Sequence, residues 1–152
     1  GLQMTNVLRD LAHDLRIGRC YLPRQDLARV SLAPEDLRDP ATLARLRPLL
    51  REHLGLTLDH YAEGWAYVLA IPPSEIRLRL ACAWPLFIGL RTLERLQTTP
   101  DLLNPRVTVK ISRPAVYAIL LRSVATVWSD AGLNRYHRAL RGRVGPTPSP
   151  AG

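Results

Sequence analysis

The sequence predicts an all-α fold, and three observations support this. The chain has 152 residues, of which 47% are hydrophobic, which is ample for a packed core. Apolar residues recur at helical spacing in several long segments. Only residues 106–111 (RVTVKI) alternate as a strand would, and this segment is too short to build a sheet. We therefore expect about four substantial helices packed around a common core.

The first helix is expected from Gly1 to Arg16. Glycine favours the left-handed conformation that ends many helices, so Gly18 is expected to stop it. The CYLP segment, residues 20–23, should then form an ordered turn. The apolar positions at helical spacing are Met4, Val7, Leu8, Leu11 and Leu15.

A loop containing Pro34 is expected to precede a long second helix. Asp39 can cap this helix and Pro40 can occupy its first turn, because proline is tolerated there. Pro48 should bend the helix near its start, and the Pro72-Pro73 pair should end it. Its apolar stripe is Leu43, Leu46, Leu50, Leu54, Leu58, Tyr61, Trp65 and Leu69.

Two further helices complete the expected domain. Ser74 can start a helix that runs to about Gln97 with a kink at Pro85. After a loop, Ser112 can cap a last helix that reaches roughly Arg141. We expect residues 1–142 to form one domain, and residues 143–152, which carry three prolines, to form a disordered tail.

The chain carries 21 basic and 13 acidic residues, a net charge of +8, which favours an anionic partner. The charge alone leaves open whether that partner is a nucleic acid, a membrane surface or a phosphorylated small molecule. Lys110 is the one lysine, so arginine, the better bidentate ligand for phosphate, supplies almost all of the positive charge.

The location of the protein can be estimated from its cysteines and apolar runs. Cys20 and Cys82 have no metal-binding spacing and cannot build a disulfide framework, which indicates a reducing compartment and hence the cytoplasm. The longest apolar run, residues 80–90, is too short to cross a bilayer. No secretory signal is recognisable. Because the chain begins inside a helical pattern, we expect it to be a fragment.

Four polar residues of the first helix share one face. On a helical wheel Gln3, Asn6, Asp10 and Asp14 fall within a stripe about 80° wide beside the apolar face. Carboxylates four residues apart repel each other unless a cation lies between them. Mg²⁺ suits such a pair, because it takes one or two carboxylates and completes its shell with water and phosphate oxygens. A solvated helix face is the alternative interpretation.

The segment NVLRDLAHDLRIGRCYLP resembles the second aspartate-rich motif of the squalene and phytoene synthase family. In that motif Asn-x-x-Arg-Asp-x-x-x-Asp leads to Gly-Arg and an aromatic turn that ends in Pro. Many members have Glu where this chain has His13, which lies off the polar stripe. The matching residues are Asn6, Arg9, Asp10, Asp14, Gly18, Arg19, Tyr21 and Pro23.

Two later segments are similar to squalene synthases in particular. LACAWPLFIGLRTL, residues 80–93, is similar to a segment in which Cys-Ala-x-Pro precedes an apolar run ending in Thr-Leu. PRVTVKISRPAV, residues 105–116, is similar to a segment with Val-Lys-Ile, a basic residue and Ala-Val. Together they favour squalene synthase over phytoene synthase within the family.

The resemblance implies an all-α isoprenoid synthase fold, of which this chain would supply the C-terminal half. In that family two farnesyl diphosphates are joined head to head through presqualene diphosphate, which squalene synthase then reduces with NADPH. Two aspartate-rich helices hold the diphosphates through Mg²⁺. This chain matches one of them, so we expect it to be inactive alone.

Residue by residue, the resemblance implies these roles. Asp10 and Asp14 would be catalytic, and with Asn6 they would bind the metal. Gln3, Asn6, Arg9 and Arg19 would bind the substrate diphosphate. Tyr21, Cys82, Trp84 and Phe87 would line the prenyl pocket, the alternative for the last two being ordinary core. Lys110 and Arg113 would bind NADPH, the alternative being a solvated basic loop.

Other functions stay open at this point. Within the family, the alternatives are a phytoene synthase or a relative that stops at presqualene diphosphate. Outside it, a basic helical module could bind nucleic acid or an acidic protein, although the arginines are scattered and no recognition signature is present. Peripheral contact with the inner face of a membrane is possible for an enzyme with an apolar product. The sequence does not give the oligomeric state.

Overall fold

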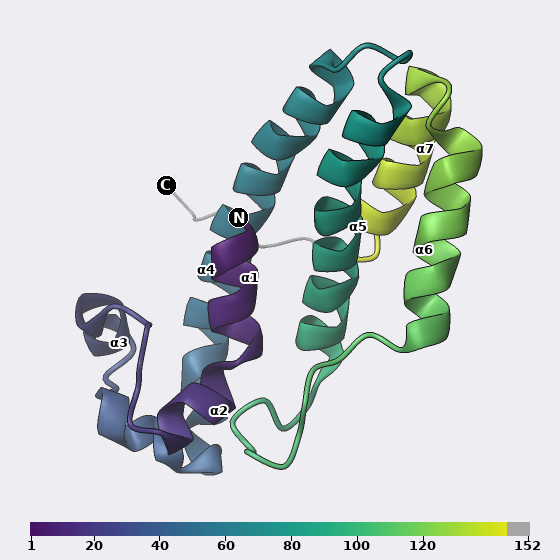
Figure 1. Ribbon diagram of the computed structural model, residues 1–152. Helices are drawn as coiled ribbons and strands as arrows, with labels where there is room; N and C mark the ends of the chain where they lie inside the picture. The colour runs from purple at the N-terminus through teal and green to yellow at the C-terminus, as the bar shows by residue number, and fades with distance from the viewer. Residues whose placement is uncertain (146–152) are drawn as a thin grey trace.

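The computed structural model describes residues 1–145, which form helices and loops without a strand. Figure 1 shows the long helices α4 and α5 side by side, with α1 against both and with α6 and α7 on the far side of α5. The all-α fold is therefore confirmed. The α-helices are α1 (Leu2–Arg9), α2 (Leu11–Arg16), α3 (Arg24–Arg29), α4 (Leu43–Ala70), α5 (Ile76–Thr98), α6 (Arg113–Thr126) and α7 (Asp130–Arg141).

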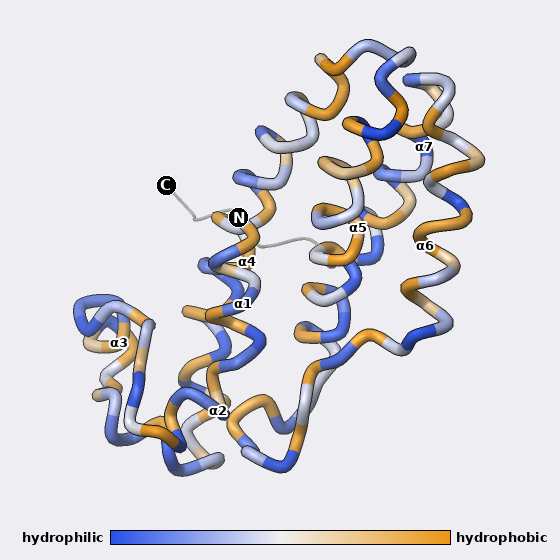
Figure 2. Tube along the Cα trace, viewed as in Figure 1, coloured by the Kyte–Doolittle hydropathy of each residue, from blue (hydrophilic) through white to orange (hydrophobic). Residues whose placement is uncertain are grey.

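The interior consists of two clusters of buried apolar side chains. One cluster lies where α1, α2 and the chain around α3 meet the start of α4 and the loop after α5; it includes Leu8, Leu11, Leu15, Leu46, Leu96, Leu103 and Val109. The other joins the remainder of α4 and α5 to α6 and α7; it includes Leu58, Trp65, Phe87, Leu90, Ile119, Leu133 and Tyr136. Figure 2 shows the alternation of apolar and polar residues along these helices that produces the two clusters.

The expected first helix is divided in two. Asp10, with φ −95° and ψ 6°, separates α1 from α2. Its N–H still donates to the Asn6 carbonyl at 2.9 Å, and its own carbonyl accepts from the Asp14 N–H at 2.9 Å. Because these bonds keep helical spacing, Asp10 and Asp14 stay one turn apart.

The end of α2 follows the prediction. Gly18 has φ +78°, a conformation that favours glycine. Its N–H donates to the Leu15 carbonyl at 3.1 Å, and the Arg19 N–H donates to the Asp14 carbonyl at 2.8 Å. This pair of bonds is the Schellman motif, which satisfies the free carbonyls of the helix end. It also brings the Arg19 backbone next to Asp14.

Several boundaries differ from the prediction. The expected Pro34 loop contains a 3-10 turn, η1 (Pro34–Arg38), and α3 was not expected at all. The Asp39 carboxylate accepts from the Ala41 N–H, but it caps a second 3-10 turn, η2 (Pro40–Thr42), which leads directly into α4. Both α4 and α5 continue through their internal prolines, Pro48 and Pro85.

The expected last helix is also two helices. Ser112 caps α6 as predicted, its hydroxyl accepting from the Ala115 N–H. The helix ends at Thr126 because Ser129 starts α7 by accepting from the Gly132 N–H. Arg79, fully buried on α5, holds this junction by donating to the Val127 carbonyl and pairing with Asp130.

Part of the expected tail belongs to the packed structure. Val144 is buried, and the Gly145 N–H donates to the Gln97 side chain at 2.9 Å. The rest of the expected tail, residues 146–152, lies outside the described residues. Within the part of the chain that the structure describes, no helix is long and apolar enough to cross a membrane.

Candidate diphosphate and metal site

The two aspartates of the polar stripe differ in their surroundings. The Arg9 guanidinium grips Asp10 through both oxygens, at 2.8 Å from Nε and 2.6 Å from a terminal nitrogen. This hydrogen-bonded pair lowers the pKa of the Asp10 carboxyl, and the pKa of Arg9 is raised in return. The Asp14 carboxylate is half-buried and makes no side-chain hydrogen bond within residues 1–145. Asp14 is therefore free to take a ligand, whereas Asp10 already has a cation.

The amide residues of the stripe are accessible. Asn6 and Gln3 are both exposed, one and two turns before Asp10. Gln3 also borders a mostly apolar depression of about 200 Å³ together with Tyr21, Val7, Leu22 and His53. The structure thus brings Tyr21 and Gln3 to the border of one depression.

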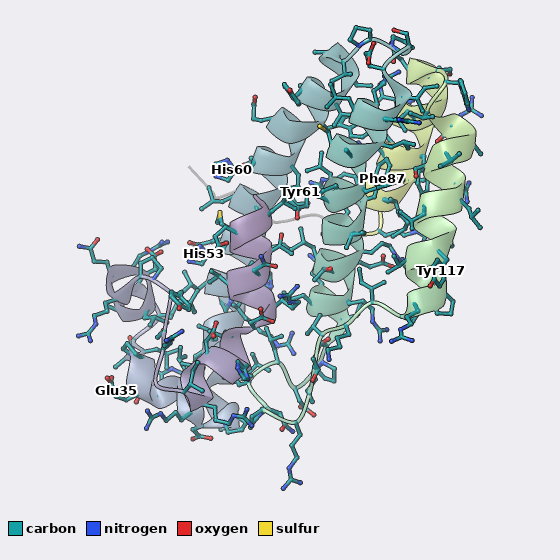
Figure 3. All side chains as sticks on the ribbon, viewed as in Figure 1. Glu35, His53, His60, Tyr61, Phe87 and Tyr117 are labelled. Carbon is teal, nitrogen blue, oxygen red and sulfur yellow. The ribbon has the colours of Figure 1, made fainter. Side chains whose placement is uncertain are left out.

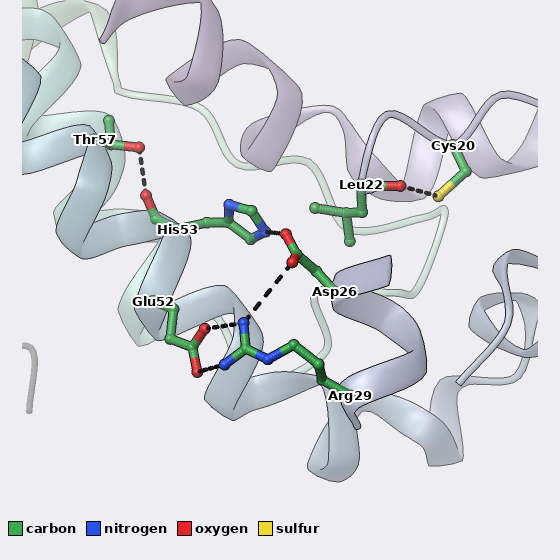
Figure 4. A network of polar contacts seen from close by, with 7 residues as sticks. All are labelled: Cys20, Leu22, Asp26, Arg29, Glu52, His53 and Thr57. Carbon is green, nitrogen blue, oxygen red and sulfur yellow. Dashed lines mark hydrogen bonds and ion pairs between the residues drawn. The ribbon is translucent and has the colours of Figure 1, made fainter. Parts of the chain in front are cut away.

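Helix α3, which follows the turn that carries Tyr21, is tied to α4 by the contacts in Figure 4. Arg29 of α3 pairs with Glu52 at 3.0 Å, and it also lies 3.8 Å from Asp26. His53 Nε2 lies 3.3 Å from an Asp26 oxygen, at ion-pair distance but without hydrogen-bond geometry. Figure 3 shows His53 on α4 facing the neighbouring turn. These contacts hold α3 beside α4, which the sequence pattern did not indicate.

The expected prenyl-pocket residues on α5 do not gather at the aspartates. Phe87 is fully buried in the second cluster, with its ring centroid 5.5 Å from Trp65 and 4.9 Å from Tyr136. The structure places it in the core, because three aromatic rings from three helices fill that position. Trp84 points toward α6, since its indole N–H donates to the Ser123 hydroxyl at 2.8 Å. Cys82 is half-buried and packs on the same cluster.

The packing of α1 on α5 explains this separation. Tyr61 of α4 lies between Thr5 and Gly89, so that α1 meets α5 at the level of Gly89. Beyond this level Leu8 of α1 and Leu11 and Leu15 of α2 join Leu96 of α5 in one cluster. Asp10 therefore lies toward the end of α5, whereas Cys82 lies near its start, seven residues before Gly89.

A group of basic side chains lies at the end of α5. Lys110 borders a depression of about 290 Å³ with Arg91, Arg95 and Ser112. Arg91 is paired with Glu94, whereas Arg95 is exposed. Arg113, assigned with Lys110 from the sequence, does not border this depression. Arg91 and Arg95 were missed, although their spacing of four residues on one helix places them on the same face.

The donor atoms near Asp10 suit Mg²⁺. Carboxylate and amide oxygens are hard ligands, and Mg²⁺ needs only one or two carboxylates when substrate phosphates complete its shell. Among residues 1–145, no group of three or more His, Cys, Asp or Glu side chains is placed to hold a metal. A metal here would need ligands beyond Asp10, Asp14 and Asn6.

Comparison with known proteins gives a consistent result. The chain is 33% identical over 126 residues to a presqualene diphosphate synthase of Zymomonas mobilis, a match that covers 82% of the chain and 41% of the relative. It is 36% identical over 110 residues to a phytoene synthase of Mycobacterium bovis, covering 69% of the chain and 35% of the relative. A phytoene synthase of Arthrospira platensis is 34% identical over 88 residues, covering 58% and 26%.

The chain thus spans less than half the length of these relatives. No solved structure matches it. The sequence profile described as squalene/phytoene synthase matches residues 1–114, which include the aspartate pair, the turn with Tyr21 and the basic group on α5. Together with the all-α fold, this match shows that the chain belongs to the squalene/phytoene synthase family.

Proposed function

We propose that this chain supplies the second aspartate-rich helix and part of the diphosphate site of a Mg²⁺-dependent head-to-head prenyltransferase. The observation that carries the proposal is the pair Asp10 and Asp14, one turn apart on a face with Asn6. The proposal draws further support from the family match and from the presqualene diphosphate synthase and phytoene synthases among the relatives.

The proposed roles follow from the chemistry of each side chain. Asp14 and Asp10, with the Asn6 amide, would hold Mg²⁺, which supplies neutralisation of the charge on a departing diphosphate. Arg9 keeps Asp10 ionised, because its hydrogen bonds lower the pKa of that carboxyl. Arg9 would also be able to turn toward a diphosphate oxygen, since guanidinium binds phosphate as well as carboxylate. Gln3 and Arg19 would complete the contacts to the diphosphate.

The prenyl chain would lie against apolar surface next to this site. Tyr21, Val7 and Leu22 border the depression that reaches Gln3. Cys82 and Trp84 would contact the prenyl chain of the substrate only if that chain is long enough to extend along α5. The substrate that we propose is farnesyl diphosphate, in keeping with the relative named presqualene diphosphate synthase.

Squalene synthase activity is a second candidate, more specific than head-to-head prenyl transfer. It would require NADPH, and the basic depression at Lys110, Arg91 and Arg95 has the donor chemistry to bind a phosphate of such a cofactor. Formation of presqualene diphosphate without reduction, or of phytoene, would need no nicotinamide. Product analysis of the full-length protein with and without NADPH separates these candidates, because only a reductase-competent enzyme converts the intermediate to squalene when NADPH is added.

The site assignment is tested by titrating the full-length protein with Mg²⁺ and a farnesyl diphosphate analogue. The double variant Asp10→Asn with Asp14→Asn should abolish Mg²⁺-dependent binding. A matched control is Asp59→Asn with Glu63→Gln, which removes an exposed acidic pair at the same spacing on α4. Affinity unchanged in the first variant, or equally reduced in the control, would contradict the assignment.

A further inference from the structure

The two aspartates of the candidate metal site differ in how open they are to a cation. Arg9 holds both oxygens of the Asp10 carboxylate, with Nε 2.8 Å from one oxygen and a terminal nitrogen 2.6 Å from the other. The Asp14 carboxylate makes no side-chain hydrogen bond or ion pair within residues 1–145. Asp14 can therefore accept a metal ion directly, whereas Asp10 has to release a guanidinium first.

The pair of Arg9 and Asp10 is a property of this chain segment by itself. The two residues are adjacent, with Arg9 at the end of α1 and Asp10 at the junction with α2. On a helical wheel Arg9 lies beside the polar stripe, on the side away from the apolar face. Its side chain is 37% exposed and that of Asp10 is 41% exposed, so both can exchange partners without unpacking the core. The pair thus needs no other part of the protein in order to form or to open.

This pair has to separate when Asp10 binds a divalent cation, because the Arg9 guanidinium repels a Mg²⁺ ion at the same carboxylate. Among residues 1–145, Asp10 is the one acidic side chain within ion-pair distance of Arg9, so no second carboxylate is in place to receive the released guanidinium. Separating an exposed ion pair of this kind weakens a competing equilibrium by up to about fivefold. The site should therefore bind Mg²⁺ alone less tightly than two carboxylates one turn apart would otherwise allow.

A diphosphate that arrives without the metal meets the converse obstacle. Asp10, Asp14 and Arg9 together carry one net negative charge, which repels an anion. Two nitrogens of the guanidinium also donate to Asp10 already. With both ligands present the obstacles disappear together, because the carboxylates are neutralised by Mg²⁺ and Arg9 is released to donate to phosphate oxygens, which it fits as well as a carboxylate. Each ligand thus removes the energetic cost of binding the other.

We propose that Arg9 couples the two ligands of the site, by keeping Asp10 closed to Mg²⁺ until a diphosphate is present to receive its guanidinium. The inference rests on the proposed function, because it assumes that Asp10 and Asp14 bind Mg²⁺. It goes further by naming the part of the substrate that opens the site, which is the charged diphosphate and not the prenyl chain. Coupling between two binding equilibria is reciprocal, so Mg²⁺ should strengthen diphosphate binding by the same factor.

The test is calorimetry of the full-length protein with Mg²⁺, in the absence and in the presence of inorganic diphosphate. The coupling factor is the ratio of the two dissociation constants for Mg²⁺, corrected for the complex that the two ligands form in solution, which is the same for every variant. We expect Arg9→Gln to bind Mg²⁺ alone more tightly and to lower the coupling factor about fivefold. Arg9→Lys, which keeps the charge but not the two-point grip on Asp10, should give an intermediate factor. Farnesol in place of diphosphate should leave the affinity for Mg²⁺ unchanged.

The matched control is Arg16→Gln, which removes an exposed arginine of α2 and should keep the coupling factor of the unchanged protein. The coupling proposal alone is overturned if Arg9→Gln keeps that factor too, or if farnesol strengthens Mg²⁺ binding, while Asp10→Asn with Asp14→Asn still removes Mg²⁺-dependent binding. If that double variant binds Mg²⁺ as the unchanged protein does, the proposed function and this inference fail together.

Discussion

The Tyr61 hydroxyl lies 2.7 Å from the Thr5 hydroxyl, in a buried hydrogen bond that joins α4 to α1. The Tyr61 ring also faces Gly89 of α5, so that three helices meet at one side chain. Burial of the phenol raises its pKa. The position of α1, and with it the direction of Asp10 and Asp14, depends on this contact.

The first prediction concerns Gly89. A Cβ atom there would overlap the Tyr61 hydroxyl, so Gly89→Ala should destabilise the protein by about 1–3 kcal/mol, as overpacked cores do. Urea unfolding followed by circular dichroism would measure the change. The control is Gly64→Ala on α4, where the nearest atom is the flexible end of Leu86. Adding Tyr61→Phe should restore the part of the loss that the hydroxyl overlap causes, and equal losses for Gly89→Ala and Gly64→Ala would contradict this explanation.

The second prediction concerns the ion pair between the fully buried Arg79 and the exposed Asp130. Asp130→Ala should destabilise the protein by about 1–3 kcal/mol, because the buried guanidinium loses its carboxylate and keeps only its hydrogen bond to the Val127 carbonyl. Arg79→Met should cost less, since the freed Asp130 carboxylate is accessible to water and the methionine fills the same space. Thermal unfolding of both variants gives the comparison. Equal losses, or a larger loss for Arg79→Met, would contradict this account.

The third prediction concerns pH. His137 stacks on Trp65 with a centroid distance of 4.1 Å, and burial together with Arg141 lowers the pKa of the imidazole to about 4. The unfolded chain binds this proton near its ordinary pKa of about 6.5, so between these values the unfolded state holds more protons. Stability should therefore fall as the pH decreases from about 6.5 to about 4. Urea unfolding at several pH values would measure the slope.

His137→Gln should flatten that slope, whereas His60→Gln, at an exposed position of α4, should leave it unchanged. A slope that persists in His137→Gln would assign the pH dependence to carboxylates elsewhere in the chain.

The fourth prediction concerns Arg9. Replacing it with Gln removes the ion pair with Asp10, so the pKa of the Asp10 carboxyl should rise toward its ordinary value. The freed carboxylate should bind Mg²⁺ alone more tightly, while the diphosphate analogue should bind more weakly. Calorimetry with each ligand separates the two effects. Tighter binding of both ligands would show that Arg9 has no part in diphosphate binding; Arg16→Gln, an exposed arginine nearby, is the control.

The sequence alone predicted what depends on neighbours along the chain. Helical spacing of leucines, the glycine at position 18 and the Ser112 cap act within one or two turns, so they identified the long helical segments and most of their outer ends, but neither α3 nor the divisions between α1 and α2 and between α6 and α7. The motif around Asp10 and Asp14 also identified the family, because its residues lie within 18 consecutive positions.

The tertiary structure decided what depends on distant partners. The division between α6 and α7 lies where Arg79 of another helix meets Asp130, and Phe87 is core because Trp65 and Tyr136 enclose it. Arg91 and Arg95 join Lys110 only because the loop after α5 returns to that helix. Contacts between residues far apart in the chain leave no periodic trace in the sequence, so only the packed helices could reveal them.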